Sequence, residues 1–83
     1  MATIEIKKKR YFKGDDLLIG KGNPFIENAA PTDTIKVLFE DTPGIAVEFS
    51  KSALVTEAHA NRVKAYPLGA WEVPTSSYRE VTA

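Results

Sequence analysis

Apolar and polar residues alternate along much of this chain, and turn-forming residues divide it into short segments. Residues 3–7 read TIEIK, and residues 16–19 read DLLI after a glycine-containing turn. Alternation over several residues, or a short apolar run between turns, is typical of a strand. The pattern therefore predicts two short strands near the start of the chain. Residues 25–26 predict a further short pairing segment, and residues 27–33 predict a surface loop.

A β-hairpin in the middle of the chain is the clearest prediction. Residues 35–39 and 45–49 each place alternate large apolar residues on one face, namely Ile35, Val37 and Phe39 in the first segment and Ile45, Val47 and Phe49 in the second. Pro43 and Gly44 lie between the two segments. Proline restricts φ at the second position of a turn and glycine accepts positive φ at the third, so these residues predict a type II turn.

The last third of the chain combines a helix pattern with two short apolar segments. Ser50 or Ser52 is suited to cap a helix over residues 53–62, where alanines follow one another closely. Residues 70–73 and 77–81 then predict two strands separated by a proline-containing turn.

These elements predict a mainly β fold with one short helix, of the all-β or α+β class. The chain has 83 residues, which is enough for one hydrophobic core and too few for two, so residues 1–83 are expected to form a single domain. A small antiparallel sheet, or a partly open barrel of the SH3-like kind with the helix over one end, would bury the apolar faces.

Composition excludes several classes of protein. The hydrophobic fraction of 43% and the charged fraction of 27% are typical of a globular domain and not of a disordered one. The chain has no cysteine, which excludes disulfides, a thiolate nucleophile and cysteine-based metal sites, and favours a cytoplasmic location. No apolar run approaches the length of a membrane span, so no membrane partner is expected.

Charge is unevenly distributed, although the net charge is zero. The first 13 residues contain one acidic residue, Glu5, and five basic ones: Lys7, Lys8, Lys9, Arg10 and Lys13. If the first strand continued, its solvent face would present a basic row with one aromatic residue, formed by Lys7, Lys9, Tyr11 and Lys13. Such a row is suited to an acidic partner or to single-stranded nucleic acid. Alternatively, the lysines protect an edge strand from unwanted pairing.

A second candidate surface contains the aromatic residues near the end of the chain. Tyr66, Trp71 and Tyr78 lie close to two prolines, and aromatic side chains are enriched at protein interfaces. The alternative is that Trp71 belongs to the core of a domain this small.

No residue set has the spacing that catalysis or metal binding requires. His59 is the only histidine, and the nearest acid, Glu57, is two positions away and off the same helical face. The glycine-rich segment 14–22 has five residues, where a phosphate-binding loop has four, between its first glycine and Gly-Lys. We therefore expect no enzyme activity, no metal and no cofactor.

The sequence thus predicts a protein-interaction module that binds a protein partner. The candidate contact residues are Lys7, Lys9, Arg10, Tyr11, Lys13, Trp71 and Tyr78. One alternative is a small-barrel nucleic-acid-binding protein that also uses Phe12, although the zero net charge predicts that such binding is weak. Another is a homo-oligomeric structural subunit that pairs sheet edges, as accessory proteins of phage or mobile elements do.

Overall fold

A computed structural model describes residues 2–20, 22–55 and 70–83 and confirms a mainly β fold with one short helix. Its strands are β1 (Thr3–Lys8), β2 (Leu17–Gly20), β3 (Thr34–Phe39), β4 (Ile45–Ser50), β5 (Ala70–Val73) and β6 (Arg79–Thr82). The helix is α1 (Pro24–Glu27), and two single 3-10 turns are η1 (Lys51–Ala53) and η2 (Thr75–Ser77). No helix in these described ranges is long and apolar enough to cross a bilayer.

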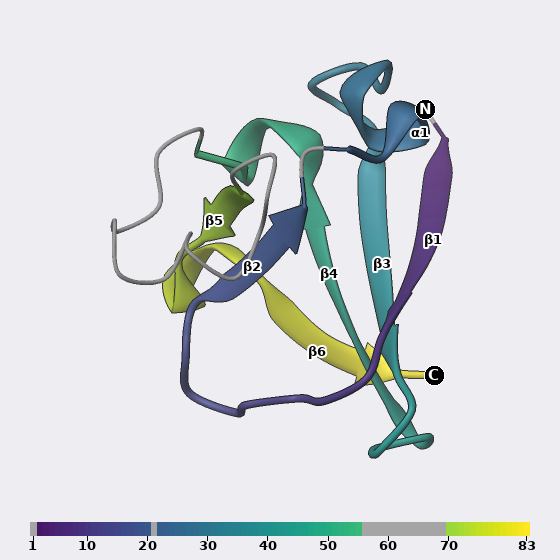
Figure 1. Cartoon of the computed structure of the whole chain (residues 1–83), viewed down its shortest axis with the longest axis vertical. Helices are drawn as coiled ribbons and strands as arrows, with labels where there is room; N and C mark the ends of the chain where they lie inside the picture. Colours follow the sequence, from purple (N-terminus) through teal and green to yellow (C-terminus); the bar gives the residue numbers. More distant parts are fainter. Residues whose placement is uncertain (1, 21, 56–69) are drawn as a thin grey trace.

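The strands form two sheets that share one core (Figure 1). The larger sheet has the order β1-β3-β4-β6, and the smaller one pairs β2 with β5. All pairs are antiparallel except β1 and β3, which run parallel, so the larger sheet is mixed and not purely antiparallel as expected. The parallel pairing follows from the long connection through β2 and α1, which returns the chain to the same end of the sheet. β1 is an edge strand, and within the described ranges it does not pair with β2.

The central hairpin is confirmed. β3 and β4 pair in antiparallel register with Val37 opposite Val47, and both residues are fully buried. The predicted type II turn is wrong, however. The N–H of Ile45 donates to the carbonyl of Thr42 across Pro43 and Gly44, but Gly44 does not adopt the positive φ that a type II turn requires.

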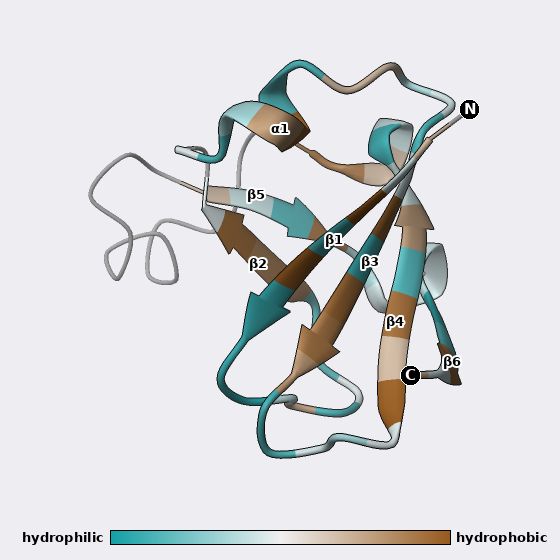
Figure 2. Ribbon diagram, turned by 90° about the vertical axis from the view of Figure 1, so that its right-hand side faces the viewer, coloured by the Kyte–Doolittle hydropathy of each residue, from teal (hydrophilic) through white to brown (hydrophobic). Residues whose placement is uncertain are grey.

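The core lies between the two sheets, and apolar residues line the facing strands (Figure 2). It is formed by ten buried residues: Leu17, Ile19, Ile26, Ile35, Val37, Phe39, Val47, Phe49, Trp71 and Val73. Ile4 and Ile6 of β1 are half-buried and pack against this cluster. Burial on one face of β1 and β3 and on both faces of β5 explains why β1 alternates in polarity while β5 does not.

Two predicted elements differ in the structure. Residues 25–26 lie in α1 and not in a pairing segment, because the Asn23 side chain caps the helix by accepting hydrogen bonds from the N–H groups of Phe25 and Ile26. The predicted helix over residues 53–62 is wrong at its start, since Val55 forms an antiparallel bridge with Glu72 of β5. The rest of that prediction lies outside the described residues.

The two C-terminal strands are confirmed, with the second shifted to Arg79–Thr82. They do not pair with each other. β5 joins β2, and β6 joins β4, because η2 redirects the chain between them from one sheet to the other.

Candidate partner-binding site

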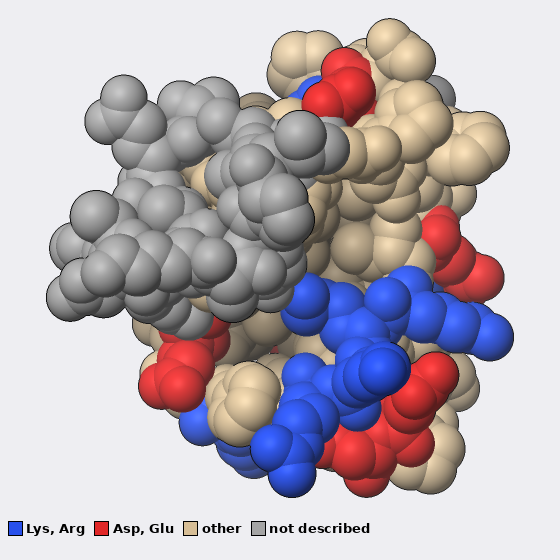
Figure 3. Space-filling view, in the orientation of Figure 1, with Lys and Arg blue, Asp and Glu red and all other residues tan. Residues whose placement is uncertain are grey.

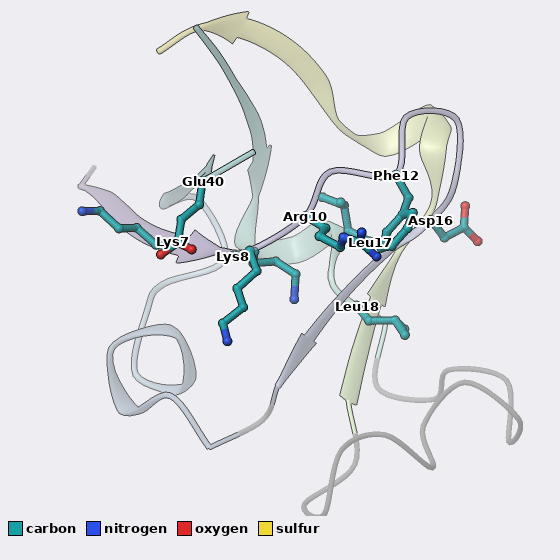
Figure 4. Close-up of a pocket in the computed structure, with 9 residues that line it drawn as sticks. Lys7, Lys8, Arg10, Phe12, Asp16, Leu17, Leu18 and Glu40 are labelled. Atoms are coloured by element: carbon teal, nitrogen blue, oxygen red, sulfur yellow. The ribbon is translucent and has the colours of Figure 1, made fainter. Parts of the chain in front are cut away.

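The basic residues near the start of the chain line a cleft at the edge of the larger sheet. This basic cleft has a volume of about 570 Å³ and lies between the end of β1, the segment after it, and β2 (Figure 4). Four consecutive residues contribute cations: Lys7, Lys8, Lys9 and Arg10. The apolar lining is Phe12, Leu17 and Leu18, and two carboxylates, Asp16 and Glu40, also line the cleft. On the face that Figure 3 shows, most of the visible lysines and arginines gather in one band, with acidic groups beside it.

The end of β1 explains how these cations come together. Ile4 and Ile6 face the core, and Lys8 is the next residue on that side, where it is half-buried. A strand that continued would direct Arg10 into the core as well, at a large desolvation cost. Instead β1 ends at Lys8, while the carbonyls of Lys8 and Lys9 accept hydrogen bonds from the N–H groups of Glu40 and Asp41. Lys9 and Arg10 are therefore both exposed.

Tyr11 does not belong to the exposed basic row, so that part of the sequence prediction is wrong. Its ring stacks on Phe39 with centroids 4.6 Å apart, and its hydroxyl donates to Oε1 of Glu80 at 2.7 Å. Burial, together with the hydrogen bond to Glu80 and the charge of that residue, raises the pKa of Tyr11. Lys13 is exposed, but its Nζ lies 3.6 Å from the same Glu80 carboxylate and does not line the basic cleft.

The alternative that Trp71 belongs to the core is confirmed, so the aromatic surface predicted near the end of the chain does not include Trp71. Trp71 is only 8% exposed and belongs to the core, and Nζ of Lys51 lies 5.6 Å from the centre of its ring. Tyr78 is half-buried, and its hydroxyl donates to the backbone carbonyl of Asp15 at 2.8 Å. Tyr66 lies outside the described residues. Trp71 therefore belongs to the core, and Tyr78 packs against it.

A second cavity adjoins the basic cleft and was missed by sequence reasoning. It has a volume of about 530 Å³ and shares Lys7 and Lys8 with the cleft, while Ile19 and Phe25 contribute apolar walls. Phe25 is 74% exposed, because it stands in the first turn of α1 and only its neighbour Ile26 enters the core. The sequence Asn-Pro-Phe is a helix-start signal that could have identified this exposed position.

Within the described ranges, no three His, Cys, Asp or Glu side chains lie close enough together to hold a metal ion. Comparison of the chain with known protein families, with curated proteins and with solved structures finds no match. The basic cleft is therefore the feature on which a proposed function depends.

Proposed function

We propose that this protein is a non-enzymatic interaction module that binds an acidic segment of another protein in the basic cleft. The observation that supports the proposal is the combination of four consecutive cationic residues with an apolar wall. Cationic side chains accelerate encounter with an acidic partner, and apolar contacts then slow its dissociation. We expect the partner to be cytoplasmic, since a small domain without cysteine is typical of a reducing compartment.

A protein partner fits the cleft better than a nucleic acid does. Asp16 and Glu40 stand among the cations and would repel a phosphate backbone. Single-stranded nucleic acid is usually held by aromatic rings on which bases stack, and among the described residues Phe12 is the only aromatic one that lines the cleft. Tyr11 was expected to be available for stacking on a base, but its ring stacks on Phe39 and its hydroxyl donates to Glu80.

The test compares two pairs of substitutions that change the net charge equally. Lys7→Gln with Lys9→Gln removes two cations from the cleft, whereas Lys13→Gln with Arg79→Gln removes two exposed cations elsewhere. The probe is a short fluorescent peptide that alternates glutamate and valine. We expect the first pair to weaken binding of the peptide by about ten-fold or more and the second pair to weaken it by about two-fold, because only the first removes direct contacts.

Salt dependence separates the two kinds of partner. Four phosphate contacts on duplex DNA would make affinity fall roughly 10²-fold between 50 and 200 mM salt. We expect the peptide complex to lose less than about ten-fold over that range, because its apolar contacts are not screened. Sub-micromolar binding of an oligonucleotide at 150 mM salt, abolished by Lys7→Gln with Lys9→Gln, would overturn the proposal in favour of a nucleic-acid partner.

A further inference from the structure

The outer edge of β1 carries backbone groups that the sheet does not use. The carbonyls of Ala2 and Lys8 accept hydrogen bonds from the N–H groups of Thr34 and Glu40 in and beside β3, at 2.9 and 3.0 Å. In a parallel pair, alternate residues of a strand direct both backbone groups toward the partner, so the even-numbered residues of β1 face β3. The N–H and C=O groups of Thr3, Glu5 and Lys7 therefore point the other way, and no described residue pairs with them.

This free edge faces an open seam between the two sheets. We define the seam as the basic cleft together with the adjoining cavity; Lys7 and Lys8 line both. β2 forms the opposite wall, with Leu17 and Leu18 in the cleft and Ile19 and Gly20 in the adjoining cavity. The seam is thus the place at which the two sheets fail to close into a barrel.

Exposed apolar side chains gather at the seam. In the part of the chain that the structure describes, three large apolar side chains are exposed: Phe12, Phe25 and Val55. Phe12 lines the basic cleft and Phe25 lines the adjoining cavity, so two of the three lie along the seam. Exposed apolar groups beside a polar rim often mark a contact surface.

Building on the function proposed above, we infer that an extended segment of the partner adds as a strand to the free edge of β1, inside the seam. Strand addition satisfies the outward backbone groups of Glu5 and Lys7 and uses side chains on alternate positions for specificity. On the outer face of β1 the segment would meet Lys7, which selects an acidic residue. On the inner face it would meet Ile6 and Ile19, which select an apolar residue.

Charge favours a foreign acidic strand over a second copy of this chain. Residues 3–10 contain four basic residues and one acidic residue, a net charge of +3. Pairing two such edges would bring two positively charged segments together, and their repulsion would oppose self-association. Lysines on edge strands commonly prevent self-association in this way. The same lysines attract a strand that alternates acidic and apolar residues. The positive charge of this edge therefore both disfavours a second copy of the chain and favours an acidic partner.

The first experiment tests the backbone contacts with modified peptides. The probe is the alternating glutamate–valine peptide, compared with two isomers that are N-methylated at every glutamate or at every valine. Strand addition requires the N–H groups on one side of the peptide, so at least one isomer should lose about ten-fold or more in affinity. If both isomers bind as well as the parent, strand addition is overturned while the proposed function stands. If the parent itself fails to bind at millimolar concentration, the proposed function is overturned.

The second experiment removes one backbone donor from the protein. Lys7→Pro and Lys7→Ala lose the same charge, but only proline removes the N–H that points away from β3. Because that N–H is not part of the β1–β3 ladder, the two variants should have similar melting temperatures. We expect Lys7→Pro to bind the peptide about five- to ten-fold more weakly than Lys7→Ala.

Equal binding by these two folded variants would contradict strand addition. If Lys7→Pro does not fold, the comparison of methylated peptides still decides the question. Sedimentation of the unmodified protein measures whether it forms a dimer. If it does, and if Lys7→Pro dissociates that dimer, the free edge of β1 pairs with a second copy of the chain and the inference is overturned.

Discussion

The hydroxyl of Tyr11 joins the segment after β1 to the last strand of the larger sheet. It donates to Glu80 of β6, and the Tyr11 backbone N–H donates to the carboxylate of Asp41, in the turn after β3. These contacts fix the segment after β1, in which Lys9, Arg10 and Phe12 line the basic cleft. The Tyr11 side chain thus positions the backbone that lines the basic cleft and does not itself contact a partner.

Removing that hydroxyl tests its role. We expect Tyr11→Phe to lower the free energy of unfolding by about 1–2 kcal/mol, because a hydrogen bond to a carboxylate is lost while stacking on Phe39 is kept. Burial also raises the pKa of Tyr11, so the folded state favours the neutral phenol. The neutral Tyr11 phenol therefore contributes its full stabilisation below the pKa of tyrosine in the unfolded chain, about 10. This contribution to the free energy of unfolding is lost as the pH rises above that value.

Urea denaturation at pH 8 and at about pH 11 provides the measurement. The loss of stability between the two values should be smaller in Tyr11→Phe than in the unmodified protein. Tyr78, whose pKa is also raised by burial, should retain part of the alkaline effect in that variant. An equally large alkaline loss in both proteins would show that Tyr11 ionises as freely in the folded state as in the unfolded chain.

At the scale of elements, the turns that contain Gly14 and Gly44 place opposite demands on the glycine backbone. Gly14, between β1 and β2, has a φ of +91°, a conformation that residues with a side chain rarely adopt. Gly44, in the β3–β4 turn, has no positive φ, and a Cβ atom at either position would meet nothing within 4 Å. Steric space is therefore equal at the two sites, and backbone conformation alone distinguishes them.

We expect Gly14→Ala to cost about 1–2 kcal/mol of stability through backbone strain. Gly44→Ala should be neutral or stabilise by up to about 1 kcal/mol, because alanine restricts the unfolded chain without straining the folded one. Denaturant midpoints of the two variants provide the comparison. A larger loss at position 44 than at position 14 would mean that the hairpin uses the type II turn that its sequence predicts.

Most of the strands that sequence reasoning predicted correctly alternate buried and more exposed positions. Val37 and Val47 are examples, since the alternation of apolar and polar residues around them predicts both that a strand forms and which face of it is buried. The sequence does not reveal which strands pair at long range, so the parallel union of β1 with β3 was not predicted. Turn type was also missed, because Pro43 and Gly44 are compatible with more than one backbone conformation.

The candidate site was predicted only in part, for a related reason. Lys7, Lys9 and Arg10 were expected on the surface, and the structure exposes them. The strand pattern was extended beyond Lys8, and Tyr11 was therefore wrongly predicted to be exposed. Side chains alternate between the two faces only within a strand, and β1 ends at Lys8. Phe25 was missed because its exposure depends on α1, which the sequence pattern did not predict.

At the scale of the whole molecule, both sheets depend on a single core. Ile19 and Val73 come from the smaller sheet, and Val37 and Val47 come from the larger one, yet all four belong to one cluster. The two sheets are therefore expected to lose their structure together.

Unfolding should accordingly be a single cooperative transition. Trp71, the only tryptophan in the chain, lies in the smaller sheet, so its fluorescence reports on the contact between the sheets. Far-UV circular dichroism reports on all strands. We expect the two signals to give the same midpoint in urea, whereas separate midpoints would show that the β2–β5 pair unfolds independently.

The pairing of strands far apart in the chain also has a consequence for the order in which the molecule is built. Among the described strand pairs, only β3 and β4 are neighbours in sequence, whereas Thr3 pairs with Thr34 and Leu17 pairs with Val73. Closing longer loops is slower, so the hairpin should nucleate folding and β1 should add to it before β2 meets β5. During that interval the edge of β1 would have no opposite wall, and its lysines would protect the half-assembled chain from aggregation.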